Sequence, residues 1–379
     1  MSNEPREVPA TDETDQKKDA VKLQREELQR QYSGARRRKV VWIIGLAGLL
    51  FVLLILGLSV GGATFDVKES WHALLTGLTL KTDQMNLNQK IIWTLRVPRV
   101  LMAIIGGIGL AISGLVMQTI LRNPLASPYT LGISSAASFG AAMCIVLGIS
   151  TSSFIAGVIP ANMIIASNSF ISATICTLVI YGLSRTQRVT AETVVLFGVA
   201  TNFLFSAATS FLQYVASEEK LAELVYWMFG SLSKATWSKV RLCVIVVAVV
   251  FILIYRKAWD FNALLLGDET AASLGLNVER LRIYGLILSS VATSVIVSLL
   301  GPIGFIGLVA PHIGRILIDS DNRFLIPVTA LLGACLLVLA DVLSCVILAP
   351  VILPVGIVTS FVGVPLLIYL ITRRRSEHW

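Results

Sequence analysis

The sequence predicts an all-α polytopic membrane protein with about ten transmembrane helices, and three observations support this fold class. Hydrophobic residues make up 55% of the 379 residues and charged residues 14%, whereas soluble domains carry about 25% charged residues. Apolar runs follow one another from Val40 to Ile371, with lengths close to the ~20 helical residues that span the hydrocarbon layer. Basic residues gather beside these runs, as orientation signals do.

Three regions follow one another along the chain. Residues 1–39 form a polar tail that is too long and too acidic to begin a signal peptide, so we expect it to stay in the cytoplasm. Residues 40–372 form the transmembrane domain, and residues 373–379 form a short cytoplasmic tail. The expected spans, in order, are 40–61, 99–121, 131–149, 160–183, 192–215, 240–255, 283–300, 302–318, 325–346 and 354–371.

The charges of the connections predict the orientation. If the chain starts in the cytoplasm, the inner connections hold Arg122, Arg185, Arg188, Arg256, Lys257, Arg280, Arg282 and Arg323. The outer connections at 150–159 and 347–353 hold no Lys or Arg, whereas the longer outer segments 62–98 and 216–239 carry basic residues with carboxylates between them. Since basic residues are retained on the cytoplasmic side, the pattern predicts that both termini are cytoplasmic.

Several functional classes are excluded by missing motifs. The sequence contains no HExxH or GxSxG motif and no GxxxxGK[ST] loop, so we expect no enzyme, and any ATP dependence must come from another subunit. The five cysteines lack CxxC spacing and the three histidines are far apart, so no resident metal or cofactor is expected. The net charge of +8 lies in clusters beside apolar runs, which indicates membrane orientation rather than nucleic-acid binding.

A cytoplasmic loop at residues 256–282 contains a candidate short helix. Asp268 is the expected N-cap and Gly275 the expected stop, as these residue types favour those positions. Ala271, Ala272 and Leu274 give the helix a small apolar face. Such a helix either sits in a groove of a partner protein or lies on the bilayer surface, and both interpretations remain open at this point.

Polar features mark both ends of the second span. At its outer end Arg96 and Arg99 flank Pro98; these arginines either pair with carboxylates of a soluble partner or snorkel to the interface. At its inner end "RNPLASPYTLGISS", residues 122–135, contains Asn-Pro and Ser-Pro, which enforce a non-helical turn. Irregular backbone at membrane depth must be covered by protein or line a cavity, so this segment is a gate or hinge candidate.

Few polar residues are expected within the membrane. Asn202 and Ser206 lie in the fifth span, Glu192 lies at its inner end, and Asp341 lies toward the outer end of the ninth. Such groups mark pathways by default, although Glu192 can instead cap its helix and Asp341 can anchor near the surface. "GPIGFIGLVAPHIGR", residues 301–315, is expected to break the chain between the seventh and eighth spans, with a structural role for His312.

Several stretches together resemble one known family. These are "RVPRVLMAIIGGIGLAISGLVMQTILRNPLASPYTLG" from residue 96, "VVLFGVATN" (194–202), "WMFGSLSKATW" (227–237), "LLLGDETAASLGLNVERLR" (264–282), "GPIGFIGLVAPHIGRIL" (301–317) and "LPVGIVTSFVGVPLLIYLI" (353–371). They are similar, in collinear order, to the permease subunits of ATP-binding cassette (ABC) importers for iron-siderophores, haem and vitamin B12.

This resemblance implies a fold like that of the vitamin B12 importer permease, with ten helices. It also implies three kinds of partner: a second permease subunit, identical or homologous; two ATPase subunits on the cytoplasmic side; and an extracytoplasmic substrate-binding protein. The location implied is the bacterial inner or plasma membrane. One departure is Cys345, which stands where many members carry a further arginine, so a third docking cation is not expected here.

The resemblance also assigns roles to individual residues. Arg96 and Arg99 match the docking cations for the binding protein. The ATPase-coupling positions are Gly267, Asp268, Ala271, Ala272, Leu274, Gly275 and Leu276. Asn123 and Leu125 match the cytoplasmic gate, and Thr190 and Ala191 a second gating layer. Asn202 and Ser206 complete the expected gate and pathway set.

The expected function is therefore the permease of an ABC importer that carries a ferric siderophore. The same architecture importing haem or cobalamin is the alternative. Two other classes are weighed: an ATP-independent secondary transporter, which needs ion-coordinating groups near the midplane, and the membrane domain of an exporter, which needs no docking surface outside.

Overall fold

The computed structural model describes residues 37–61, 66–79, 85–148, 163–186 and 191–373, and every regular element in these ranges is helical. The first helix is Arg37–Ser59. The others are α2 Val67–Thr79, α3 Leu87–Ile91, a π-helical turn Ile92–Arg96, α4 Val97–Ile120, α5 Ile133–Leu147, α6 Ile164–Thr186, α7 Ala191–Val215, α8 Glu218–Met228, α9 Trp237–Arg256, α10 Ala258–Leu265, α11 Asp268–Ser273, α12 Val278–Leu300, α13 Ile306–Ile318, α14 Asn322–Val346 and α15 Val355–Arg373.

The prediction of about ten membrane helices is confirmed. Seven helices in the described ranges are long and apolar enough to cross a membrane, and α5, α13 and α15 are shorter apolar helices. Each of the ten coincides with one expected span. The boundaries of the second span are wrong, however, because the helix begins at Leu87 and runs without a break to Ile120. The two polar tails fall almost entirely outside the described residues.

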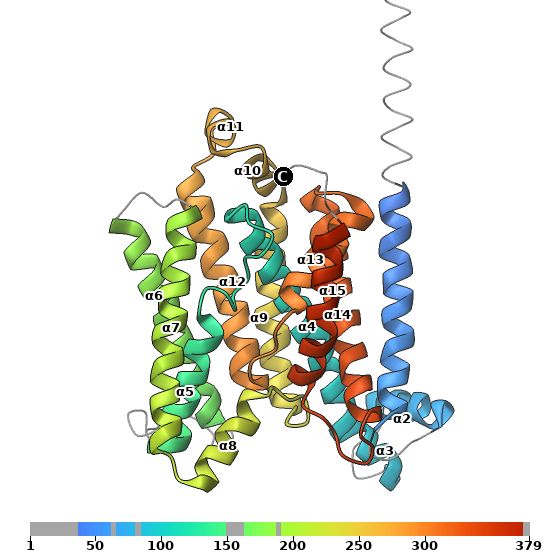
Figure 1. Ribbon diagram of the computed structural model, residues 1–379. Coiled ribbons are helices and arrows are strands. Elements are labelled where there is room, and N and C mark those ends of the chain that lie inside the picture. Colours follow the sequence, from blue (N-terminus) through green and yellow to red (C-terminus); the bar gives the residue numbers. More distant parts are fainter. Residues whose placement is uncertain (1–36, 62–65, 80–84, 149–162, 187–190, 374–379) are drawn as a thin grey trace, which may run out of the picture.

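Different short helices lie at the two ends of the bundle (Figure 1). The first helix starts, and α15 ends, at the end of the bundle where α11 lies. The helices α2, α3 and α8 lie at the opposite end. The chain therefore begins and finishes its membrane passages on the α11 side, as an even number of spans requires. That this side is cytoplasmic remains a prediction from the charge pattern.

The helix α4 lies at the centre of the bundle and packs against α14, α12, α13 and α9. Its glycines allow the closest approaches. A Cβ atom added at Gly107 would collide with the carbonyl of Gly333 in α14, and one added at Gly114 would collide with that of Gly307 in α13. Small residues at such crossings let helices pack tightly in lipid.

Two non-helical segments lie at the depth of the membrane helices. After α4 the chain turns back, and α5 begins only at Ile133. After α12, residues 301–305 turn back through Gly301, whose φ is +78°, and Phe305, whose φ is +67°, and α13 then covers the remaining distance in 13 residues. Figure 1 shows both short helices starting partway across the bundle. The expected break at Gly301, Pro302 and Gly304 is confirmed.

The helix α13 contains Pro311, and a side chain from α4 supplies the hydrogen-bond donor that this proline lacks. Pro311 has no N–H, so the carbonyl of Gly307 loses its helical partner. Gln118 Nε2 lies 3.5 Å from that carbonyl oxygen and 3.4 Å from that of Leu308. Gln118 Oε1 in turn accepts a hydrogen bond from Arg315, which is buried. His312 is also buried, so both polar side chains, His312 and Arg315, face protein.

Candidate functional site

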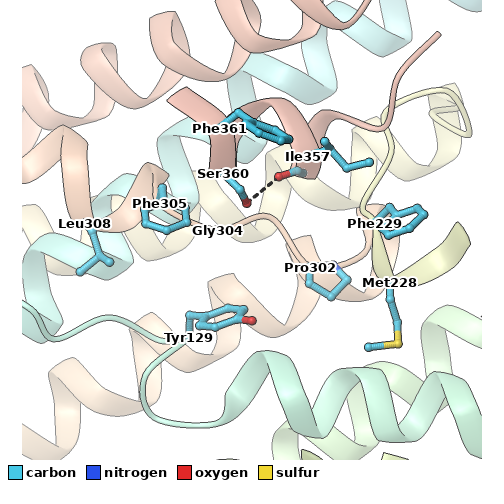
Figure 2. Close-up of a pocket in the computed structure, with 11 residues that line it drawn as sticks. Tyr129, Met228, Phe229, Pro302, Gly304, Phe305, Leu308, Ile357, Ser360 and Phe361 are labelled. Atoms are coloured by element: carbon cyan, nitrogen blue, oxygen red, sulfur yellow. Dashed lines mark hydrogen bonds between the residues drawn. The ribbon is translucent and has the colours of Figure 1, made fainter. Parts of the chain in front are cut away.

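A cavity of about 470 Å³ lies where the two non-helical segments meet α15. Figure 2 shows Tyr129 from the segment after α4 below Pro302 and Phe305 from the turn before α13, with Ile357 and Phe361 of α15 above. Met228, Phe229, Gly304, Leu308, Gly356 and Ser360 complete the lining. This wall is mainly aromatic and aliphatic.

A second cavity of about 200 Å³ adjoins the first and shares Tyr129, Met228 and Pro302 with it. Its other lining residues are polar: Ser134, Ser135 and Ser138 from α5, and Ser206, Thr209, Ser210 and Gln213 from α7. Of the α7 residues, Thr209 and Ser210 follow Ser206 by three and four positions, and Gln213 follows Ser210 by three, so all four share one helix face. Together the two cavities form a space with one aromatic wall and one hydroxyl-rich wall, which suits a bulky organic molecule that offers both apolar surface and hydrogen-bonding groups.

Of the predicted pathway residues, Ser206 lines this space and Asn202 contacts Ser135, a residue of its polar wall. Asn202 Oδ1 accepts a hydrogen bond from Ser135 Oγ and thereby ties α7 to the first turn of α5. Gly132, at φ +79°, begins α5 against the backbone of Asn202, where a Cβ would lie 2.8 Å from its nitrogen. The hydroxyls of α5 and the remaining polar groups of α7 were not predicted, although their spacing on otherwise apolar helices is visible in the sequence.

The predicted gate residues lie at the α11 end of α4. Asn123 Oδ1 accepts a hydrogen bond from the backbone N–H of Leu125 at 2.9 Å, which forms the turn expected before Pro124. The Leu125 side chain is 49% exposed. Ala191 begins α7, whereas Thr190 lies outside the described residues. Glu192 is exposed in the first turn of α7.

Arg96 and Arg99 lie at the opposite end, and neither is a freely exposed cation. Arg99 makes a bidentate ion pair with Asp341 of α14, with its Nη2 2.7 Å from Oδ1 and its Nε 2.9 Å from the same oxygen. Arg96 is buried and donates from Nη1 to the carbonyls of Leu58 and Ser59, at 2.7 and 2.9 Å. These carbonyls are at the end of the first helix and lack helical partners.

This geometry revises two expectations. Arg96 does not snorkel to the interface; it caps the C-terminus of the first helix. Asp341 is 3% exposed, so it is neither a surface anchor nor a residue of the cavities described above, and its partner is Arg99. A carboxylate from another protein would have to compete with these internal contacts. Cys345 lies in the same cluster, within reach of Ser344.

The short helix predicted in the loop 256–282 is present as α11, but its N-cap is wrong. Gly267 is the N-cap residue, with φ +116°, and Asp268 is the first helical residue. The Asp268 carboxylate therefore turns away from the helix N-terminus and accepts two hydrogen bonds from Arg282 Nη2, at 2.9 and 2.8 Å. Gly275 adopts φ +84° and ends the helix as predicted.

The predicted apolar face of α11 is divided between core and surface. Ala271 is completely buried and Leu276 is half-buried, whereas Ala272 and Gly275 are exposed. Leu274 is 63% exposed. An exposed leucine at the tip of a short helix is a surface suited to an apolar groove in another protein.

The preceding helix α10 is fixed by a separate polar cluster. Asn262 of α10 donates to Asp321 at 2.9 Å and accepts from the backbone N–H of Asn322 at 2.8 Å. Arg323 pairs with Asp321 at 2.7 Å and stacks on Trp259, with the guanidinium carbon 4.0 Å from the ring centre. Burial acts to raise the pKa of Asp321, but the hydrogen bonds from Arg323 and Asn262 and the charge of Arg323 hold it below its ordinary value.

Comparison with known proteins identifies the family. The chain matches the FecCD transport family over residues 31–373. It is 42% identical over 349 residues to a putative ABC transporter permease protein of Methanocaldococcus jannaschii, an alignment that covers 92% of this chain and 98% of the relative. It is 37% identical over 337 residues to the hemin transport system permease protein HmuU of Yersinia pestis, with coverage of 88% and 96%.

A solved structure supports the same assignment. This structure, described as an inward-facing conformation of a putative metal-chelate type ABC transporter, matches with a TM-score of 0.75 at 27% identity. The match covers 88% of this chain and 99% of the solved chain. The resemblance in the sequence is therefore confirmed. The chain belongs to the FecCD transport family: it is a multi-pass permease subunit of an ABC importer, a transport component of the cell membrane rather than an enzyme.

Proposed function

We propose that this permease imports a ferric siderophore that an extracytoplasmic binding protein delivers. The observation that carries the proposal is the space around Tyr129 and Pro302, which joins an aromatic wall to a hydroxyl-rich wall. A siderophore complex is an organic shell around iron, with apolar linkers and many oxygen acceptors. The shell would pack on Phe305 and Phe361 and accept hydrogen bonds from the serines of α5 and α7.

The names of relatives support this class of substrate without narrowing it to one compound. They include permeases for hemin, iron chelatin, iron(3+)-hydroxamate and cobalamin. A molybdate permease is also among them, at 31% identity. Four of these five cargoes are bulky metal-binding organic compounds or their complexes. Haem and cobalamin therefore remain the alternatives, and the two-walled cavity fits a large chelate better than a small oxyanion.

The proposed assembly follows from the exposed surfaces. The cavity lies beside α7 and α15, which expose Phe203, Phe211, Tyr214 and Phe361 to between 65% and 89%. We assign this face to a second permease subunit, identical or homologous, so that the two copies enclose the pathway. Two ATPase subunits would receive α11 through Leu274, at the cytoplasmic end. The binding protein would dock at the end that carries α2, α3 and α8, where its carboxylates would reach Arg99 by displacing Asp341 and would meet Arg96 nearby.

In this mechanism the chain forms no covalent bond with the substrate. ATP binding would move the ATPase subunits and α11, and the pathway helices would follow as rigid bodies. The segment with Asn123 and Leu125 would then open or close the inner end. Thr190 and Ala191, of which Ala191 begins α7, would form a second gating layer.

The substrate is tested through the binding protein encoded with this chain. The purified binding protein is titrated with a ferric hydroxamate, a ferric catecholate, hemin and cobalamin, and each bound compound is then offered to the reconstituted complex with ATP. We expect tight binding and ATP-dependent uptake of a ferric siderophore. Exclusive binding and uptake of hemin or cobalamin would refute the siderophore assignment and leave the importer assignment in place.

A further inference from the structure

Arg282 in the second turn of α12 joins two elements that are far apart in the sequence. Its side chain is 7% exposed. Its Nε donates to the carbonyl of Ile120, the last residue of α4, at 3.0 Å. Its Nη2 donates to both carboxylate oxygens of Asp268, the first residue of α11. One guanidinium therefore contacts the end of the central helix and the start of the short cytoplasmic helix.

The contact with α4 has a cause in the sequence. The carbonyl of Ile120 would normally accept from the backbone nitrogen four residues later, but that residue is Pro124, which has no N–H. The proline that ends α4 therefore leaves a carbonyl to be satisfied, and Arg282 supplies the donor. A guanidinium presents several donors in a planar fork, so it can hold a carbonyl and a carboxylate at once.

The two contacts of Arg282 differ in how much other packing holds the same elements together. On the α4 side, α12 lies directly against α4, because a Cβ at Gly285 would lie 2.9 Å from both Ile120 and Val116. On the α11 side, the helix has only six residues, and its buried anchor is Ala271. The Asp268 carboxylate is 46% exposed. The ion pair of Arg282 with Asp268 thus connects the short helix α11 to the two long, closely packed helices α4 and α12.

The end of α4 leads directly into the segment at the cavity. Arg122 follows with φ +46°, a left-handed conformation that is rare for a residue with a side chain. Asn123 and Leu125 come next, and Tyr129 of the same segment lines both cavities. A displacement of the α4 terminus must therefore be absorbed by this segment, because no regular structure intervenes before α5.

We propose that Arg282 is the positioning residue that transmits movement of α11 to the end of α4 and to the segment 122–132. This inference rests on the proposed function, in which ATPase subunits act on α11. When α11 is displaced, the bidentate contact carries Arg282 and the Ile120 carbonyl with it. Without that contact α11 moves alone and the segment 122–132 stays in place. Arg282 itself touches neither substrate nor ATP.

The test uses the full importer in proteoliposomes, with ATP hydrolysis and substrate uptake measured on the same preparations. Asp268→Asn removes the charge of the partner but leaves the Arg282 contact with Ile120, and Arg282→Gln removes both contacts. Lys257→Gln is the matched control, because it removes a 2.8 Å salt bridge of the same loop that joins residues only three apart. Co-purification with the ATPase subunits checks assembly.

We expect both variants to assemble with the ATPase subunits and to lose substrate uptake far more than ATP hydrolysis. The number of molecules imported per ATP should fall about tenfold or more, the scale set by loss of a charge-assisted hydrogen bond. The control should retain its transport ratio. A second readout is thiol labelling of Leu125→Cys, whose rate should change with ATP in the wild-type background and should lose that change with Asp268→Asn.

Two results would overturn the inference. One is parallel loss of hydrolysis and uptake in both variants, and the other is an unchanged transport ratio in Asp268→Asn. If the wild-type complex shows no ATP-dependent uptake of any of the four compounds, the proposed function fails and the inference fails with it. If the wild-type complex transports and only the ratio prediction fails, the importer assignment stands and Arg282 is a structural residue.

Discussion

Replacing Arg99 with methionine should destabilise the permease by about 3–5 kcal/mol, the cost of leaving one member of a buried ion pair without its partner. The Arg99 side chain is 14% exposed and that of Asp341 is 4% exposed. Three hydrogen bonds of 2.7 to 3.1 Å join them. With Arg99→Met the Asp341 carboxylate keeps its burial but loses the charge that balances it. The double variant Arg99→Met/Asp341→Leu removes both charges and should recover most of the stability.

The free energy of unfolding is measured in detergent micelles by denaturant titration of the purified subunit. Lys257→Met provides the control, because that salt bridge is 47% and 26% exposed at its two ends, and an exposed pair contributes about 0–1 kcal/mol. A single variant as stable as the wild type would refute the reasoning, as would a double variant less stable than the single one.

The same double variant separates the structural role of Arg99 from its proposed docking role. If Arg99 also receives a carboxylate of the binding protein, affinity for that protein should fall about tenfold or more in the double variant, whose stability is restored. Unchanged affinity would remove Arg99 from the docking surface. The ion-pair argument would then remain intact.

Three further predictions concern other parts of the fold. Gly114→Ala should prevent folding of a stable subunit, because the added Cβ collides with the Gly307 backbone. Gly182→Ala should be tolerated, because no heavy atom lies within 4 Å of the added Cβ. Expression level and thermal unfolding of the two variants test this difference. Leu274→Asp should prevent co-purification of the ATPase subunits without lowering the unfolding temperature, because this side chain is 63% exposed; retained ATPase binding would contradict the assigned surface. The pKa of Asp321 is lowered in the fold, so its contribution to stability is present above about pH 4, the ordinary range of an aspartate, and is lost as pH falls through the lower folded value. Thermal unfolding measured between about pH 5 and pH 2 should show this loss of stability in the wild type but not in Asp321→Asn.

Much of the fold could be predicted because hydrophobicity alone determines where a membrane helix can lie. Each of the ten apolar runs coincides with a helix, and the breaks near Gly301 and Pro124 follow from the Gly-Pro and Asn-Pro pairs, which favour turns. The start of the second span was missed because "NQKIIWTLRVPRV" is too polar to count as apolar, yet it continues the helix through a π-helical turn. Pro98 directly follows this π-helical turn, in which the N–H of Val97 bonds to the carbonyl of Ile92, five residues back.

The partners of the charged residues could not be predicted from local sequence. Arg99 and Asp341 are 242 positions apart, and only the packing of α4 on α14 brings them together. Asp268 has the residue type of an N-cap, but Gly267 takes that position because its φ of +116° is open to glycine. The polar stripe of Ser206, Thr209 and Gln213 could have been found from its helical spacing. That this stripe forms a cavity wall could not be predicted, because the cavity also depends on where α5 packs.

The central claim, that this chain is the membrane passage of an ATP-driven importer, is tested most directly by uptake into proteoliposomes. The permease is reconstituted with its ATPase subunits, with the substrate-loaded binding protein outside and ATP inside. The ferric siderophore should accumulate only when ATP and the ATPase subunits are both present. Accumulation by the permease alone, driven by an ion gradient, would contradict the account.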